Sequence, residues 1–197
     1  MIGNCVQSTT LESDGILIME FDNFIGRQKM FLSEKECDSI IDAMYDKNLQ
    51  YIEIQIEHNK SRSDTSAFLD PDTDLFKTLN TKLFESLKPY IKEYYLPYID
   101  HYKNTNIKIQ VSEDGGGFHN WHYEWSQNVP FREIVWMVYL NDDFEGGHTE
   151  FEFLNHSEKP ETGKLLLFPA GYTHRHRASP KLKGQKYIIT GWFQRKT

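Results

Sequence analysis

The sequence predicts an α+β protein in which early helices support a β-sandwich or jelly roll formed by the later half of the chain. Two amphipathic helical stripes fall before residue 95, and short strand-like runs recur between glycine turns from residue 107 to residue 193. Helices first and many short, evenly spaced strands afterwards are typical of proteins whose helices cover one side of an antiparallel sheet.

The first half of the chain contains both expected helices. Ser33 and Glu36 form a capping box that opens the first helix, and its apolar face follows at helical spacing: Cys37, Ile40, Ile41, Met44 and Tyr45. The second helix is indicated by the stripe Leu75, Leu79, Leu83, Leu87, Ile91 and Tyr94. Pro89 is expected to kink or end that second helix. Because both stripes must be buried, the helices are expected to pack on a sheet.

Shorter segments of the first half are assigned from their pattern. Residues 1–13 are expected to be a loose leader, and the apolar run at residues 16–21 a strand. Isoleucines alternate with polar residues over residues 52–57, which predicts a strand with one apolar face. The polar stretch of residues 58–74 is expected to form a long loop.

The second half is expected to consist mainly of strands. Apolar or aromatic runs bounded by turn residues predict strands at residues 107–111, 118–125, 133–140, 149–154, 165–168 and 187–193. Glycines at 115–117 and 146–147 indicate two of the turns between them. Their even spacing supports the sandwich or jelly roll.

Length and charge limit the classes of protein that fit. A chain of 197 residues fits one domain, expected to span residues 1–197, with helical support and edge strands over about 14–105 and the β core over about 106–195. The 29 acidic residues exceed the 22 lysines and arginines, which argues against a nucleic-acid binder.

The location is expected to be cytoplasmic. No apolar run approaches the roughly 20 residues of a membrane span, and residues 1–15 lack the apolar segment of a signal peptide. Cys5 and Cys37 are too few for a disulfide framework or a cysteine-built metal site. Any metal site must therefore use histidines and carboxylates. No membrane partner is expected, and nothing in the sequence predicts the oligomeric state.

Three His-x-Glu steps are candidates for metal binding, because alternate residues of a strand point to the same face. They are His122 with Glu124, His148 with Glu150, and His156 with Glu158. The step at His156 lies in a polar, hairpin-like segment and is expected to be exposed, and the step at His148 follows a glycine turn. The step at His122 lies in an aromatic run, where burying His and Glu is costly unless they are paired or bind a metal.

A third ligand is expected from a distant strand. His174 and His176 both follow a predicted strand end, and the alternative for this segment is a basic surface loop. Two histidines and one carboxylate with open coordination positions form the facial arrangement favoured by non-haem Fe(II) oxygenases.

Five motifs in order then carry a resemblance to a known family. They are GFHNWHYE at 117–124, YLNDDFEGGHTEF at 139–151, GKLLLFP at 163–169, HRASP at 176–180 and GQKYIITGW at 184–192. Residues 107–193 resemble the 2-oxoglutarate and Fe(II)-dependent dioxygenases, most closely the prolyl 4-hydroxylase-like branch. The resemblance implies a double-stranded β-helix, the jelly-roll core, with helices packed on one sheet.

The resemblance also assigns roles to single residues. His122, Glu124 and His176 match the iron ligands, and His176 is preferred to His174 because a proline follows it by four residues and a lysine by ten. That lysine, Lys186, matches the residue that holds the distal carboxylate of 2-oxoglutarate. Tyr139 matches a tyrosine that donates a hydrogen bond to the same carboxylate, with core packing as its alternative. Thr190 shares a strand face with Lys186 and is a further candidate contact.

Two positions depart from the family pattern. Glu124 stands where most relatives have Asp, so the charge is kept but the carboxylate lies one methylene further out. The halogenating members lack a carboxylate at this position, which disfavours a halogenase. Residues 112–114 stand where many relatives place a tyrosine near the cosubstrate, and the sequence offers no substitute.

The resemblance implies a dioxygenase that uses Fe(II), 2-oxoglutarate and O2 to hydroxylate an unactivated C–H bond, with succinate and CO2 as coproducts. Peptidyl-prolyl 4-hydroxylation is the expected reaction, and ascorbate is expected as a reductant. Hydroxylation of a free amino acid or other small metabolite, or a non-catalytic jelly-roll binding module, are the alternatives. Residues that could line a substrate groove, or serve only packing and solvent contact, are Trp121, Tyr123, Trp125 and Arg177. The loop expected at residues 58–74, with Arg62, could close over a substrate as in prolyl hydroxylases.

Overall fold

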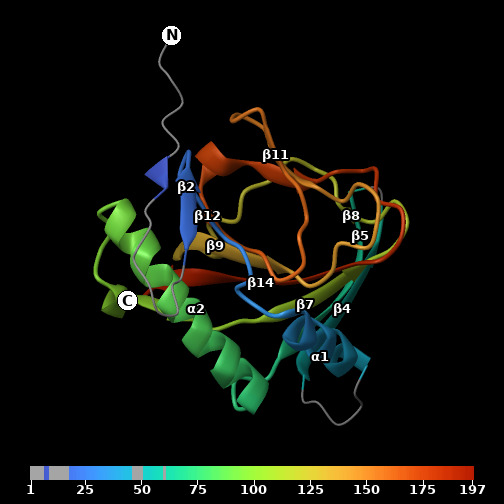
Figure 1. The fold of residues 1–197 in the computed structure, drawn as a ribbon, viewed down its shortest axis with the longest axis horizontal. Coiled ribbons are helices and arrows are strands. Elements are labelled where there is room, and N and C mark those ends of the chain that lie inside the picture. The colour runs from blue at the N-terminus through green and yellow to red at the C-terminus, as the bar shows by residue number, and fades with distance from the viewer. Residues whose placement is uncertain (1–6, 9–17, 46–50, 60) are drawn as a thin grey trace.

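The structure is a computed structural model that describes residues 7–8, 18–45, 51–59 and 61–197. The described residues form two antiparallel β-sheets and two α-helices, α1 (Glu34–Tyr45) and α2 (Asp74–Glu93). Short 3-10 helices occur at Ile99–His101 and Tyr172–His174. Figure 1 shows both α-helices on one side of the larger sheet and the smaller sheet on the other. No helix in the described ranges has the length and apolar character needed to cross a membrane.

The larger sheet has eleven strands. Nine of them follow the order β1 (Gln7–Ser8), β2 (Met19–Asp22), β3 (Ile25–Gln28), β12 (Leu165–Pro169), β9 (Arg132–Tyr139), β14 (Lys186–Arg195), β7 (Lys108–Ser112), β5 (Arg62–Leu69) and β4 (Tyr51–His58). Two short strands join this path, β6 (Tyr102–Asn104) beside β14 and β8 (Gly117–Phe118) beside β5. The smaller sheet has the order β11 (His156–Glu158), β10 (Thr149–Phe151) and β13 (His176–Ala178).

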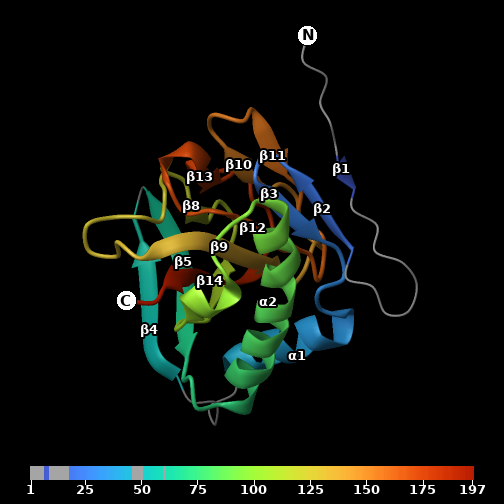
Figure 2. The same cartoon turned by 90° about the vertical axis from the view of Figure 1, so that its left-hand side faces the viewer.

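Strands β9 and β14 separate two apolar cores. On β9, Trp136 and Val138 face a core shared with both α-helices, whereas Val135 and Met137 face a core on the side of the smaller sheet. Both faces of these strands are therefore buried, which explains why they read as continuous apolar runs without alternation. Figure 2 shows α2 running alongside this sheet. The predicted α+β sandwich with helices on one sheet is confirmed.

Both predicted helices form, and their starts follow from side-chain capping. The Ser33 backbone N–H donates to Glu36 Oε2 at 2.8 Å, and the Glu36 N–H donates to Ser33 Oγ at 3.3 Å, which is the predicted capping box. Pro89 was predicted to kink or end α2; it does not end the helix, which continues to Glu93. The missing hydrogen bond is outweighed by the burial of neighbouring α2 residues such as Leu87.

The prediction of a loop at residues 58–74 is also wrong, because this stretch contains β5 in the larger sheet. Two of its polar side chains, Arg62 and Asp64, pair with each other beside the cavity rather than facing solvent. Asp64 is buried and accepts two hydrogen bonds from Arg62, at 2.6 and 2.9 Å. The polar pattern therefore marks a strand that faces a polar interior.

The predicted strand at residues 118–125 is strand only at its start, in β8. The rest turns toward the smaller sheet, because the His122 N–H donates to His176 O at 3.1 Å and the His176 N–H donates to His122 O at 2.8 Å. The Glu124 N–H also donates to Ala170 O at 3.0 Å. These bonds bring the segment across the opening between the two sheets.

Three predictions for the first half are only partly covered by the described residues. Gln7–Ser8 form β1, so the loose leader is wrong there, and the rest of residues 1–13 lie outside the described part. In the strand predicted at residues 16–21, residues 19–21 belong to β2, Ile18 precedes it, and residues 16–17 are not described. In β4, Ile56 is exposed rather than part of a buried apolar face, and the side chains of residues 51–54 are not described.

Candidate metal and cosubstrate site

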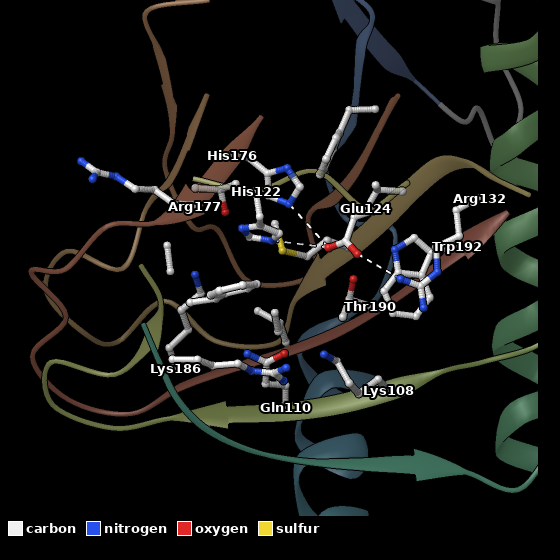
Figure 3. A pocket seen from close by; sticks show the side chains of 18 of the residues that line it. Lys108, Gln110, His122, Glu124, Arg132, His176, Arg177, Lys186, Thr190 and Trp192 are labelled. Atoms are coloured by element: carbon white, nitrogen blue, oxygen red, sulfur yellow. Dashed lines mark hydrogen bonds and ion pairs between the residues drawn. The ribbon is translucent and has the colours of Figure 1, made fainter. Parts of the chain in front are cut away.

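A cavity of about 290 Å³ lies between the two sheets, on the side of the larger sheet away from the α-helices. Its walls come from nine strands and from the segment that follows β8. Side chains that line it include Arg62, Lys108, Gln110, His122, Glu124, Arg132, Thr149, His176, Arg177, Lys186, Thr190 and Trp192. Figure 3 shows that most of these side chains point inward.

The structure brings His122, Glu124 and His176 together at this cavity. One ligand atom from each lies within 4.8 Å of the other two. His122 Nε2 is 3.5 Å and His176 Nε2 is 3.8 Å from Glu124 Oε1. Among the described residues this is the one group of three or more His, Cys, Asp or Glu side chains arranged to hold a metal ion.

The two imidazole rings are oriented by their other nitrogen. His122 Nδ1 donates to Asn120 O, and His176 Nδ1 donates to His174 O, each at 2.9 Å. A carbonyl oxygen only accepts, so Nδ1 carries a proton in both rings. Nε2 of each ring is therefore the atom left for a ligand, and it faces the Glu124 carboxylate. This arrangement matches the backbone support usual for metal-binding histidines.

Aromatic contacts hold the same rings in place. The His122 ring stacks on Phe118 with centroids 3.9 Å apart, and the His176 ring packs edge-on against Phe168 at 4.9 Å. His176 is buried at the start of β13. His174 lies elsewhere, because its Nε2 donates to Asn23 O at 2.8 Å and it does not line the cavity. The geometry thus groups His176, and not His174, with His122 and Glu124.

The protonation states suit a cation between these three groups. Burial acts to raise the pKa of Glu124, but the hydrogen bond from His122 and the charges of both histidines and Arg132 lower the pKa to about 2. Burial, followed by the charge of His122, lowers the pKa of His176 to about 4. At neutral pH the site therefore contains an ionised carboxylate and a neutral His176 imidazole.

Arg132 was not predicted as a site residue. Its Nη1 donates to Glu124 Oε2 at 3.2 Å, which leaves Oε1 to the two histidines. Its guanidinium carbon lies 3.4 Å from the centre of the Trp192 ring. Arg132 thus fixes the carboxylate from the side opposite the histidines. The sequence carries no pattern around residue 132 that separates it from an ordinary arginine at the start of a strand.

Lys186, which the resemblance assigns to the cosubstrate carboxylate, lines the cavity. It is 6% exposed, and its Nζ donates to Gly147 O at 2.5 Å. Burial lowers its pKa to about 7. Thr190 lines the same cavity, although its hydroxyl donates to Trp136 O at 2.9 Å. Both side chains belong to β14 and can contact a ligand in the cavity.

Tyr139 packs in the core, as in the alternative given for it, and its hydrogen bond to 2-oxoglutarate stays a prediction. It is fully buried outside the cavity lining, and its hydroxyl is hydrogen-bonded to Thr149 Oγ1 at 2.7 Å. Lys186 Nζ lies 5.2 Å from the centre of the Tyr139 ring. Tyr139 therefore touches the site through Thr149 and through the face of its ring.

The five candidate substrate residues divide into two groups. Arg62 and Arg177 line the cavity, each paired with a carboxylate, Asp64 and Glu150 respectively. The three aromatic candidates do not line it: Trp121, Tyr123 and Trp125. Tyr123 and Trp125 are exposed, and Trp121 lies beneath the Arg177 guanidinium at 4.3 Å.

Lys108 and Gln110 on β7 also line the cavity and were missed as site residues. A signal was present in the sequence, because residues 107–111 alternate apolar and polar residues as Ile-Lys-Ile-Gln-Val. In a strand with both faces buried, polar side chains are expected only where they face a polar interior.

The other two His-x-Glu steps have different partners. His148 is hydrogen-bonded to Ser157, and Glu150 to Arg177. His156, predicted to be exposed, is only partly so, because its Nε2 lies 2.9 Å from Arg27 Nη2 and 2.8 Å from Glu158 Oε2. Neither step is joined by a third ligand among the described residues.

Comparison with known proteins agrees with this geometry. Residues 107–194 match the model of the 2OG-Fe(II) oxygenase superfamily. These residues, somewhat under half of the chain, are thus similar to that superfamily. The three grouped side chains, Lys186 and Thr190 all lie within the matched range.

Among the proteins similar to this chain are ones named as prolyl hydroxylases. A putative prolyl 4-hydroxylase of Acanthamoeba polyphaga mimivirus is 35% identical over 71 residues, which cover 32% of this chain and 29% of that protein. Prolyl 3-hydroxylase 2 of Rattus norvegicus is 32% identical over 68 residues, covering 32% of this chain and 10% of that protein. The matched part is thus less than a third of either relative.

The fold comparison extends over most of the chain. The viral collagen prolyl hydroxylase of Paramecium Bursaria Chlorella virus-1, solved with 2OG, superimposes with a TM-score of 0.70 and 22% identity, over 88% of this chain and 97% of that one. The predicted double-stranded β-helix of the superfamily is therefore confirmed.

Proposed function

We propose that the protein is a 2-oxoglutarate- and Fe(II)-dependent dioxygenase whose iron is held by His122, Glu124 and His176. The observation that carries the proposal is the convergence of two backbone-oriented imidazoles and one ionised carboxylate on a cavity. Two histidines and a carboxylate leave coordination positions open, as non-haem Fe(II) oxygenases require. The Glu in place of the usual Asp fits because Arg132 holds its outer oxygen.

Bound Fe(II) would supply the chemistry that couples decarboxylation of 2-oxoglutarate to oxidation of a C–H bond by O2. The residues of this chain would bind and orient the iron and the 2-oxoglutarate. Lys186 carries a buried ammonium with one carbonyl acceptor, so it can pair with the distal carboxylate of 2-oxoglutarate. Thr190 adds a hydroxyl, and Tyr139 supports Lys186 through the face of its ring.

The coproducts of this reaction are succinate and CO2, and the substrate we propose first is a prolyl residue in a peptide, hydroxylated at C4. The names of the relatives support a prolyl substrate. Arg62 and Arg177 lie in the cavity wall and could meet backbone carbonyls of a bound peptide. Trp121, Tyr123 and Trp125 lie outside the cavity and could contact the parts of a peptide that remain outside it.

Two alternatives differ in class. A free amino acid or other small metabolite would use the same metal and cosubstrate residues, with the whole molecule inside the cavity. A non-catalytic jelly-roll module would bind a ligand without turnover. The complete set of His122, Glu124, His176 and Lys186 favours an enzyme, since a binding module has no need of all four. Ascorbate as reductant and a cytoplasmic location stay predictions.

The test uses the purified protein with Fe(II), 2-oxoglutarate, ascorbate and O2. Succinate formation that depends on oxygen and on Fe(II) is the expected result. A panel of peptides with and without proline, read by a mass gain of one oxygen, then identifies the substrate. No succinate with any substrate, while the protein still retains metal, would support the binding module instead.

A further inference from the structure

The cavity contains a second buried lysine for which the proposed reaction gives no partner. Lys108 is 8% exposed, lies on β7 and lines the same cavity as Lys186. Among the described residues, none is within hydrogen-bonding or ion-pairing distance of its ammonium. Figure 3 shows the amino end of Lys108 directed into the cavity, beside Gln110 and Thr190 and facing Glu124.

The two lysines stand at opposite ends of the cavity floor. In the β7–β14 pair, Lys108 lies opposite Thr190, whereas Lys186 lies opposite Ser112. Lys186 and Thr190 are four residues apart on one strand, which corresponds to about 13 Å. A 2-oxoglutarate that reaches from Lys186 to the metal ligands therefore leaves the Lys108 end of the cavity for another molecule.

The charges around Lys108 do not neutralise it. The cavity is lined by five cationic side chains and one carboxylate, Glu124, in a protein whose formal net charge is -7. The three arginines are each matched by a carboxylate, Asp64, Glu124 and Glu150. Lys186 has a carbonyl acceptor and a place in the proposed cosubstrate site. Lys108 is the cation in this lining that has no such partner.

An ammonium held in this way favours an anionic ligand. Burying a charge without a partner costs free energy, so the fold keeps Lys108 at a cost that a bound anion would offset. Burial, followed by the charge of Arg62, lowers the pKa of Lys108 to about 8. The side chain is therefore still mostly protonated at neutral pH.

We propose that Lys108 binds a carboxylate of the substrate, so that the molecule hydroxylated here carries an anionic group close to its reacting C–H bond. This inference rests on the proposed function, which assigns the distal carboxylate of 2-oxoglutarate to Lys186. The carboxylate can come from a free amino acid or from an acidic side chain or chain end beside the reacting residue. Gln110, on the same face of β7, adds an amide at this end.

The test compares ligands that differ only in carboxylate or amide. The probes are N-acetylproline against N-acetylprolinamide, and acetyl-Pro-Glu-amide against acetyl-Pro-Gln-amide. Each is measured by ligand-observed NMR on the full chain with Zn(II) and 2-oxoglutarate, and again without them, so that no turnover is needed. The wild type is expected to bind the carboxylate member of at least one pair about tenfold more tightly or better. The first pair reports a free acid and the second an acidic neighbour.

Variants then connect the preference to one side chain. Lys108→Met should abolish it, Lys108→Arg should keep part of it, and Lys183→Met, at an exposed lysine, should leave it intact. The affinity for 2-oxoglutarate should be unchanged in Lys108→Met. The proposal would be overturned if the wild type bound acid and amide equally, or bound no probe at millimolar concentration. It would also be overturned if the preference survived in Lys108→Met, or if that variant bound 2-oxoglutarate more weakly. Failure of the proposed function would appear separately, as absence of succinate formation or of bound metal.

Discussion

Two pairs with the same His-x-Glu spacing occupy different environments in this protein. His156 and Glu158 on β11 lie among cations: Arg27 donates to one Glu158 oxygen at 2.7 Å and Lys164 donates to the other at 2.8 Å. His122 and Glu124 lie at a cavity, where a second histidine joins them and Glu124 has one cationic partner, Arg132. The difference lies in what the rest of the fold brings to each pair.

The two regions show how neighbouring charges decide the role of a buried carboxylate. Both oxygens of Glu158 already have cationic donors, so that pair has a structural role and no room for an ion. Glu124 keeps Oε1 facing two imidazole nitrogens whose protons are on the other side of each ring. A metal ion can satisfy this oxygen and both rings at once.

Buried lysines follow the same division. Lys164 beside Glu158 has three acceptors for its three protons: Glu158 Oε1, Glu161 Oε1 and Lys159 O. Lys186 in the cavity has one acceptor, and Lys108 has none among the described residues. Complete pairing marks the structural region, and incomplete pairing marks the region that we assign to ligands.

The largest effect is expected from a comparison in which one histidine is removed from each region in turn. His176→Ala removes one proposed metal ligand and should abolish succinate formation from 2-oxoglutarate. The matched variant His156→Ala, at the other His-x-Glu step, should keep most of the activity once stability is allowed for. Oxygen-dependent succinate release, measured on both proteins at equal folded concentration, checks this. Activity retained by His176→Ala would remove that residue from the site.

Glu158→Gln should lower the free energy of unfolding by about 3–5 kcal/mol, because Lys164 and Arg27 would lose a buried partner. Burial acts to raise the pKa of Glu158, but hydrogen bonds from Lys164, His156 and Arg27 lower the pKa to about 2. Its contribution is therefore complete above about pH 4.5 and is lost as pH falls toward 2. Urea unfolding at pH 7 and at pH 3 should show a smaller difference between wild type and variant at the lower pH.

Lys186→Met should raise the 2-oxoglutarate concentration needed for half-maximal rate by about tenfold to a hundredfold, since a charge-assisted bond to the carboxylate is lost. The rate at saturating cosubstrate should change much less. Lys183→Met serves as the control, because that lysine is exposed. An unchanged cosubstrate requirement in Lys186→Met would place 2-oxoglutarate elsewhere.

The smallest effect is expected for stability at Lys108. Lys108→Met should raise the free energy of unfolding at pH 7 by about 1–2 kcal/mol, because an unpaired buried charge is removed. The folded-state pKa is lowered from 10.5 to about 8, so the wild type should recover this difference as pH rises from about 8 toward 10.5. Thermal unfolding at pH 7 and pH 9.5 checks this. A loss of stability at both pH values would indicate a structural role for Lys108.

Local signals in the sequence were sufficient for several elements. The Ser33–Glu36 capping box, both helices and the core strands follow from spacing and capping, which act over a few residues. The order of motifs also grouped His122, Glu124 and His176, and their proximity in the fold agrees with it, while their role in binding iron stays a proposal. The single-domain extent of residues 1–197 likewise stays a prediction.

The remaining features depend on partners far away in the sequence. Arg27 and Glu158 are 131 residues apart, so no local pattern shows that the carboxylate of the step His156-x-Glu158 is already paired with an arginine. The polar stretch at residues 58–74 is partly a strand because Arg62 and Asp64 satisfy each other beside the cavity. The hydrogen bond between Tyr139 and Thr149 likewise could not be read from the sequence, and the role of Tyr139 toward 2-oxoglutarate stays a prediction.

The central claim is that His122, Glu124 and His176 together hold one Fe(II). The most direct measurement is the number of Fe(II) ions retained per chain under anaerobic conditions, for the wild type, His176→Ala and His156→Ala. We predict one ion per chain for the wild type and for His156→Ala, and none for His176→Ala. Retention of iron by His176→Ala, or its loss from His156→Ala alone, would contradict this assignment.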